Sequence, residues 1–242
     1  MPTTAPLTPQ ADGTTAGSPE HPLLVTSRAG GYARVETVAD IATLLTPKDV
    51  LVVNTATLGS ISETKRPDPD AGEALREFVP ARQIPVAGAF IDPVLLDTLH
   101  HHGVVLAPVT LHTAPKGDQS HLATEWFSVS QLAVDLITGA KETGRRVIAL
   151  GTSALRAVEA AVGPDHHLRE HDDGDWTNIT INFECPPRII TGLLTGLHSP
   201  GSTHRDALAA LTGWQLLFHA YNVAAAHGHY PGRSTLIHLA LP

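Results

Sequence analysis

The chain has 242 residues, a formal net charge of −8 and one cysteine, and 42 % of its residues are hydrophobic. This is a globular composition at a length that suits a single domain with a sizeable core. The lone Cys185 excludes an internal disulfide, and we expect it to be a small packed residue. The acidic balance argues against a broad nucleic-acid-binding surface and favours a small-molecule substrate.

No segment has the pattern of a targeting or membrane-spanning sequence. Residues 1–20 are rich in Pro, Thr, Gly and Ala, without a basic or apolar signal region, and predict a disordered tail. No stretch downstream approaches the roughly 18 apolar residues of a membrane span. We expect a cytoplasmic protein with no membrane partner, in which residues 21–242 form one domain. Its oligomeric state stays open.

Strand and helix patterns alternate along the chain. Strands are predicted at 32–38, 50–53, 104–112, 124–129, 146–150, 176–183, 188–197 and 235–241. Helices are predicted at 38–45, 93–102, 131–143, 154–162, from about Thr203 onward, and 214–227. The two runs 176–183 and 188–197 are expected to pair with each other. Without a GXGXXG motif, the alternation predicts a mixed α/β (α+β) fold: a mixed sheet or open β-barrel with packed helices.

Residues 63–84 interrupt this pattern with polar and Pro-rich sequence, which predicts a linker containing a short helix at 72–78. The 15 histidines include a triplet at 100–102 and a pair at 166–167. Neither group has the His-X-X-X-His spacing or the neighbouring carboxylates of a zinc site, so no metal is predicted.

Residues 151–156, GlyThrSerAlaLeuArg, form a strand-to-helix turn with three interpretations. Free backbone N–H groups and the helix dipole could hold a carboxylate or other anion there. A serine nucleophile elbow requires a second glycine, but Leu155 occupies that position. In the plainest interpretation, Ser153 is an ordinary N-cap and Arg156 an exposed helix residue.

Two further stretches place titratable groups at strand ends. Alternation along the strand 124–129 puts Glu125 and Phe127 on one face and Trp126 on the opposite face, so either face could line a pocket. His112 ends a strand just before a break, a common place for active-site residues. His198 ends another strand and His204 begins a helix, which lets both face one crevice as acid or base groups.

Six stretches, taken together and in order, resemble the S-adenosylmethionine:tRNA ribosyltransferase-isomerase family of the queuosine pathway. They are KDVLVVNTATL (48–58), PVAGAF (85–90), VTLH (109–112), EWFSV (125–129), GRRVIALGTSALRAVE (144–159) and GLLTGLHSPGSTH (192–204). The resemblance that they carry extends over roughly residues 22–240.

The chain also departs from the family's pattern. Thr55 and Thr57 replace an Asp and an Arg, Ala89 and Ala123 stand where histidines are expected, and Arg233 replaces an Asp. Where relatives carry a second domain, only the short linker 63–84 is present, so we expect that domain to be missing.

The resemblance implies a pocket for S-adenosylmethionine, used as a substrate. Its sulfonium acidifies a C5′ proton; removal of that proton leads to loss of adenine, transfer of the ribose carbons to an amine, and departure of methionine. The implied catalytic residues are His112, Glu125 and His198. The implied S-adenosylmethionine-binding residues are Gly151, Thr152, Ser153, Arg156, Trp126 and Thr195. The implied acceptor-binding residues are Asn54, Gly88 and His204.

Three functions remain open from the sequence. The departures and the acidic charge favour S-adenosylmethionine chemistry on a small-molecule acceptor, with tRNA less expected as a partner. The alternatives are the tRNA reaction itself and an inactive S-adenosylmethionine-binding module. Loss of the Asp, Arg and His residues favours the inactive module, whereas retention of residues 151–156 and 192–204 opposes it.

Overall fold

The computed structural model describes residues 19–56, 65–67, 75–77, 93–113, 124–231 and 236–242. The main strands are β1 (Pro22–Ser27), β2 (Tyr32–Thr37), β3 (Val50–Asn54), β6 (Val105–His112), β7 (Glu125–Val129), β8 (Val147–Leu150), β9 (His171–Thr177), β10 (Gly192–Gly196) and β11 (Ile237–Leu241). The helices are the 3-10 helix η1 (Val38–Asp40), α1 (Ile41–Leu44), α3 (Pro93–His101), α4 (Gln131–Glu142), α5 (Gly151–Ala160), α6 (Thr203–Thr212) and α7 (Trp214–Ala226).

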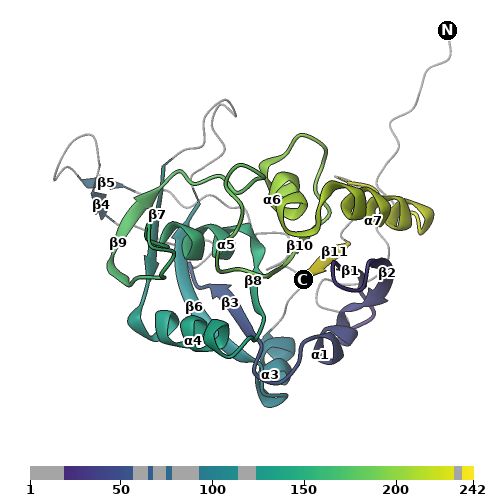
Figure 1. The fold of residues 1–242 in the computed structure, drawn as a ribbon, viewed down its shortest axis with the longest axis horizontal. Coiled ribbons are helices and arrows are strands. Elements are labelled where there is room, and N and C mark those ends of the chain that lie inside the picture. Colours follow the sequence, from purple (N-terminus) through teal and green to yellow (C-terminus); the bar gives the residue numbers. More distant parts are fainter. Residues whose placement is uncertain (1–18, 57–64, 68–74, 78–92, 114–123, 232–235) are drawn as a thin grey trace, which may run out of the picture.

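The nine strands form one mixed sheet in the order β2-β1-β11-β10-β8-β3-β6-β7-β9 (Figure 1). The fold is therefore mixed α/β, as predicted, and the open sheet rather than the barrel is the correct alternative. At its centre, β10, β8, β3 and β6 run parallel. Their carboxyl ends meet at one edge of the sheet, which we call the carboxyl edge.

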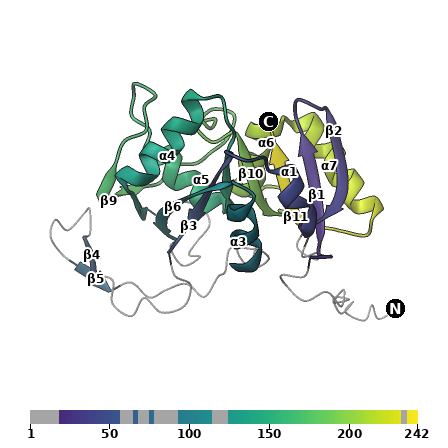
Figure 2. The same ribbon diagram turned by 90° about the horizontal axis from the view of Figure 1, so that it is seen from below.

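Helices cover both faces of the sheet. On one face, α4, α5 and α6 pack on buried side chains that include Val52, Val109 and Phe127. On the other face, α1 and α3 pack on side chains that include Leu51 and Ile148. Figure 2 shows α4 and α5 on the opposite side of the sheet from α3. This alternation of buried residues along each strand fixes its register, because a shift by one residue would exchange the two faces.

Serine caps position two of these helices as the sequence predicts. The Ser130 side chain accepts a hydrogen bond from the Ala133 N–H at the start of α4, and Ser202 accepts one from Arg205 at the start of α6. Gly213 then separates α6 from α7 with a φ of 83°, a conformation that favours glycine. The short connection keeps the two helices in contact.

The paired strands predicted at 176–183 and 188–197 are wrong in extent and in partner. Strand β9 comprises only His171–Thr177 and pairs with β7, whereas β10 comprises Gly192–Gly196 and lies between β8 and β11. The N–H groups of residues 188–190 bind the carboxylate of Glu159 instead of a neighbouring strand. This carboxylate explains why β10 begins later than its apolar pattern suggests.

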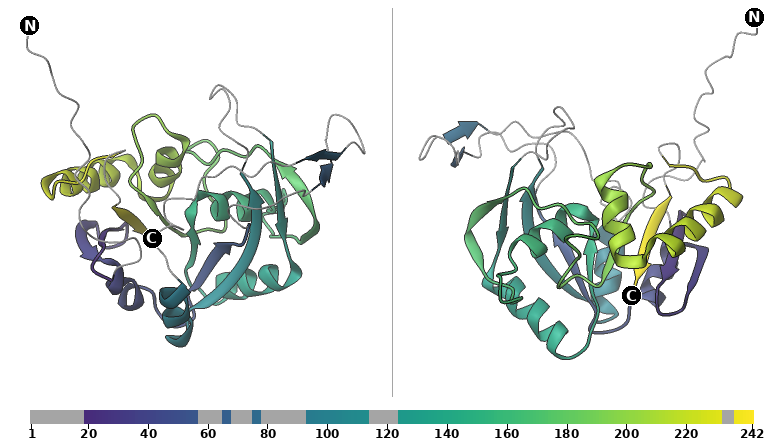
Figure 3. Two further views of the ribbon diagram at one scale, coloured as in Figure 1. Left: turned by 180° about the vertical axis from the view of Figure 1, so that it is seen from behind. Right: turned by 45° about the horizontal axis from the view of Figure 1, so that its top comes forward.

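The first part of the chain also differs from expectation. Strand β1 was not predicted, although it lies between β2 and β11 in the sheet. The Pro19 carbonyl, within the predicted tail, accepts a hydrogen bond from the Ala39 N–H, while residues 1–18 lie outside the described part. Within the predicted linker, residues 75–77 form strand β5 (Leu75–Glu77), not helix, and pair with β4 (Lys65–Pro67) in a separate sheet (Figure 3). The rest of that linker lies outside the described residues.

Candidate active site at the carboxyl edge

The carboxyl edge gathers most of the predicted site residues. Strand β8 lies between β3 and β10, with Leu150 opposite Val53 on one side and Leu194 on the other. The turn at Gly151 therefore emerges between Asn54 and Thr195. Ligand sites in α/β sheets form at the carboxyl ends of parallel strands, so this edge is the candidate site.

Asn54 joins β3 to the end of β6. Its Nδ2 donates to the Leu111 carbonyl at 3.0 Å, and its Oδ1 accepts from the N–H groups of Leu111 and Ala56, both at 3.0 Å. The Asn54 side-chain amide thus bonds the backbone of β6 beyond the end of β3, where a further strand residue would otherwise pair. Its hydrogen bonds position the edge, and its predicted contact with the acceptor stays a prediction.

His112 and Trp126 lie together at the next position along the edge. They face each other across β6 and β7, with ring centroids 5.3 Å apart and an interplanar angle of 33°. The indole also packs against Gly174 of β9, where φ is 77° and an added Cβ would collide with the Trp126 ring. Glycine at this position therefore allows Trp126 to lie flat against β9. Gly88, a predicted acceptor contact, lies outside the described residues.

Glu125 and Arg156 form an ion pair beneath this edge. An Arg156 Nη1 donates to Glu125 Oε2, and Nε donates to the Ile179 carbonyl at 2.9 Å. The two side chains are only 9 % and 15 % exposed. The interpretation of Arg156 as an exposed helix residue is therefore wrong, because its guanidinium reaches inward to a carboxylate on β7. Glu125 is likewise engaged with Arg156 rather than aimed only at the site.

The turn at residues 151–153 begins α5 directly. Gly151 has a φ of 83° and is the first residue of the helix, with Leu150 at the N-cap position. Ser153 is therefore not the N-cap, because the helix has already begun two residues earlier. Its hydroxyl is buried and has no hydrogen-bond partner among the described residues. The first turn of α5 thus presents backbone N–H groups at the carboxyl edge, as an anion site requires.

His198 and His204, predicted to face one crevice, lie against each other. Their rings stack with centroids 4.6 Å apart and an interplanar angle of 25°. His198 Nε2 lies 2.8 Å from Thr195 Oγ1. The Tyr221 hydroxyl accepts from the His198 N–H and donates to its carbonyl, at 3.2 Å and 3.0 Å. Backbone and ring are both held, so this loop presents a fixed histidine pair.

His198 is held in its unprotonated form at neutral pH. Burial, and to a smaller degree the neighbouring His204 and His238, lower the pKa of His198 to about 3. Burial alone lowers the pKa of His238 to about 3 as well. His238 was missed from the sequence, although a histidine in the otherwise apolar strand β11 is the signal that could have revealed it. It is fully buried, with Nε2 lying 3.1 Å from Thr26 Oγ1.

A family model described as "Queuosine biosynthesis protein" matches residues 79–230, more than half of the chain. The chain belongs to this family. It is 33 % identical over 154 residues to the S-adenosylmethionine:tRNA ribosyltransferase-isomerase of Desulfitobacterium hafniense, covering 60 % of this chain and 45 % of that protein. The corresponding protein of Novosphingobium aromaticivorans is 35 % identical, with 60 % and 44 % covered.

The chain thus spans less than half the length of the curated relatives it matches. A crystal structure of S-adenosylmethionine tRNA ribosyltransferase from Thermotoga maritima matches with a TM-score of 0.71 at 18 % identity, covering 99 % of each chain. That likeness confirms the fold. The resemblance inferred from the six sequence stretches is confirmed, whereas the predicted loss of a second domain stays a prediction.

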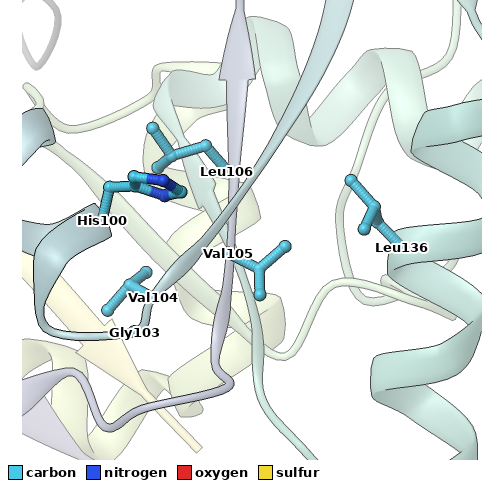
Figure 4. Close-up of a pocket in the computed structure, with 6 residues that line it drawn as sticks. All are labelled: His100, Gly103, Val104, Val105, Leu106 and Leu136. Atoms are coloured by element: carbon cyan, nitrogen blue, oxygen red, sulfur yellow. The ribbon is translucent and has the colours of Figure 1, made fainter.

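Away from the carboxyl edge, a hollow of about 560 Å³ lies at the amino end of β6. Figure 4 shows His100 and Leu106 on one side of the strand and Val105 with Leu136 on the other. None of the predicted site residues lines it. Within the described residues, no group of three or more His, Cys, Asp or Glu could hold a metal, and no helix is long and apolar enough to cross a membrane.

Acidification should destabilise the protein through its buried histidines. His198 and His238 bind protons less readily when folded than when unfolded, so stability falls as the pH drops from about 6.5 towards 3. Each contributes a slope of about 1.4 kcal/mol per pH unit within that window. Urea unfolding at about pH 7.5 and about pH 5, above most carboxylate titrations, measures the loss. A His238→Gln variant should show a smaller loss; an unchanged loss would contradict the assignment.

Proposed function

We propose that this chain is an S-adenosylmethionine-dependent ribosyltransferase-isomerase and that its acceptor is tRNA. The arrangement of the carboxyl edge supports this proposal. There, the α5 turn lies between Asn54 and Thr195, and the His198–His204 pair follows β10. The names of the relatives favour tRNA over the small-molecule acceptor that the acidic composition favoured. A tRNA acceptor in turn implies a cytoplasmic location.

The length of the edge suits an elongated substrate. From β6 to β10 there are three inter-strand spacings, about 14 Å in all. At one end, the His112–Trp126 pair offers flat rings against which adenine can stack. In the middle, the first turn of α5, with Thr152 and Ser153, offers N–H and hydroxyl groups to the methionine carboxylate. At the other end stands the histidine pair.

The Glu125–Arg156 pair has a supporting role in this proposal. Because the Arg156 guanidinium already binds Glu125 and the Ile179 carbonyl, it is less suited to anchor a carboxylate than the α5 N–H groups are. It links α5 to β7 and so fixes the distance between the α5 turn and Trp126. We therefore assign Arg156 and Glu125 to positioning rather than to contact with the reacting atoms.

The histidine pair is the proposed site of proton transfer at C5′. S-adenosylmethionine supplies the sulfonium that acidifies this proton. At neutral pH His198 is unprotonated, but a pKa of about 3 makes it a weak base. Its hydrogen bond with Thr195 and its stacking on His204 suit it to orient the substrate and His204. Proton acceptance is then assigned to His204, whose ring stacks on that of His198 at the start of α6.

The test is incubation of the protein with S-adenosylmethionine, alone and with tRNA that carries the acceptor amine, followed by mass spectrometry. The proposal expects adenine, methionine and a modified tRNA nucleoside, all dependent on tRNA. Adenine released equally without RNA would overturn the tRNA acceptor and support a small-molecule one. Calorimetric binding without any product would identify an inactive S-adenosylmethionine-binding module.

Replacing His204 should test its assignment separately. A His204→Ala variant is expected to lower kcat about 100-fold or more, because general acid–base catalysis contributes at least that much. Its KM for S-adenosylmethionine should change little. His101→Ala, which removes an exposed histidine at the end of α3, is the matched control and should retain full activity. Full activity in His204→Ala would exclude it as the base.

A further inference from the structure

A group of exposed aromatic rings lies beside the histidine pair, on α7 and the segment that precedes β10. Phe183, Trp214 and Phe218 are 53 %, 37 % and 52 % exposed, and they are three of the five large hydrophobic residues exposed in the described part of the chain. We call these three rings the aromatic platform. Large exposed apolar groups are unremarkable singly, but contiguous ones mark a binding surface.

The rings of the platform form one continuous surface. The Trp214 and Phe218 centroids are 5.5 Å apart at an interplanar angle of 25°, and those of Phe183 and Trp214 are 6.1 Å apart at 36°. Trp214 and Phe218 are four residues apart on α7 and therefore share a helix face. The platform thus presents near-parallel rings to solvent, the arrangement on which another flat ring can stack.

Arg205 of α6 adds a positive charge behind these rings. Its guanidinium carbon lies 5.4, 5.2 and 5.3 Å from the ring centroids of Trp214, Phe218 and Tyr221. The residue is only 9 % exposed, and its Nε has no hydrogen-bond partner. Across the described ranges, no carboxylate forms an ion pair with it. Within the described residues this buried cation contacts rings and no carboxylate, so its positive charge is not neutralised and can attract an anion to the platform of a chain whose net charge is −8.

We propose that the aromatic platform and Arg205 bind an unstacked base of an RNA loop together with its adjoining phosphate. The rings can stack on the base of a nucleotide, and the guanidinium can attract its phosphate. Proteins recognise single-stranded RNA by stacking its bases on such rings. A small-molecule site would enclose its ligand, whereas these rings are open to solvent. The inference rests on the proposed tRNA acceptor and names the surface that recognises it.

The position of the platform relative to the histidine pair supports this assignment. Arg205 follows His204 directly on α6, and Tyr221, which lies under Arg205, holds the backbone of His198 through its hydroxyl. A base stacked on the platform therefore holds the neighbouring nucleotide next to the histidine pair. The platform would fix which nucleotide of a loop reaches the reacting atoms.

The experiment measures binding of a fluorescein-labelled RNA stem-loop by anisotropy, with the fully paired duplex of the same stem as a comparison. Trp214→Ala should weaken stem-loop binding about ten- to hundredfold, and Trp214→Phe, which keeps a ring, should recover most of it. Arg205→Met should reduce the slope of log affinity against log salt concentration by about one. Leu132→Ala, which removes an exposed apolar side chain from α4, is the matched control and should bind as the parent does.

Stem-loop binding that is unchanged in both Trp214→Ala and Trp214→Phe would overturn the proposal. The proposal would also be overturned if the parent were a dimer in size-exclusion chromatography and Trp214→Ala were a monomer with unchanged RNA affinity. That result would show that a second copy of the chain covers the rings. Thermal melting confirms that each variant is folded. If the parent modifies tRNA and Trp214→Ala binds RNA normally, the platform is refuted and the proposed function stands. If Trp214→Ala weakens RNA binding but the parent forms no product, only the proposed reaction is refuted.

Discussion

Replacing Arg156 with alanine is expected to lower the free energy of unfolding by about 3–5 kcal/mol. The substitution leaves the Glu125 carboxylate buried without its cation and the Ile179 carbonyl without its donor. Removal of one partner from a buried pair is costly because the other charge stays desolvated. Urea unfolding of the variant and the parent at neutral pH measures the difference.

A double-mutant cycle separates this structural role from ligand binding. Arg156→Met combined with Glu125→Leu should recover most of the lost stability, because a well-packed apolar pair can replace a buried ion pair. Calorimetry of this double variant with S-adenosylmethionine is then decisive for Arg156. Affinity equal to that of the parent would establish the positioning role, and a large loss would instead show that the guanidinium contacts the methionine carboxylate.

Glu159→Ala is the second substitution with a large expected effect, also about 3–5 kcal/mol of unfolding free energy. The carboxylate is completely buried and accepts the backbone N–H groups of Arg188, Ile189 and Ile190 at 2.8, 2.9 and 2.8 Å. Alanine would leave three buried donors without an acceptor, and each unsatisfied group costs about 1–3 kcal/mol.

Thermal and urea unfolding of Glu159→Ala measure this loss, with Glu142→Ala on the exposed end of α4 as the control. Glu159→Gln should lose less, because its amide oxygen can still accept from Ile189 and Ile190. A Glu159→Ala variant as stable as the control would contradict the anchoring role. Hydrogen exchange at residues 188–190 offers a local measurement, since these amides should lose protection first.

Local signals in the sequence were sufficient for the elements that carry their own start and stop residues. Ser130 before an apolar periodic run predicted α4, and the cap is present. The proximity of His198 and His204 was expected from a strand end and a helix start separated by a short loop, but the stacking of their rings was not. These features depend on residues close together in the chain, where sequence patterns are informative.

The missed features depend on partners far apart in the chain. Strand β9, HDDGDWT, has a β-branched residue only at its end, Thr177, and lacks apolar alternation; it forms because β7 offers it an edge and Gly174 accommodates Trp126. The partner of Arg156 is 31 residues away on β7, and no spacing rule connects the two positions. The platform likewise depends on the packing of Phe183 against α7.

Strand β11 also bears on the order in which the molecule folds. It is hydrogen-bonded in parallel to β1 and antiparallel to β10, so the β1–β2 hairpin reaches the rest of the sheet only through it. Because β11 follows every other element along the chain, the ladder between β1 and β11 closes the longest loop in the described fold. Contacts of such high sequence separation form late and slowly. During synthesis, the β1–β2 hairpin can therefore join the rest of the sheet only after β11 has been made.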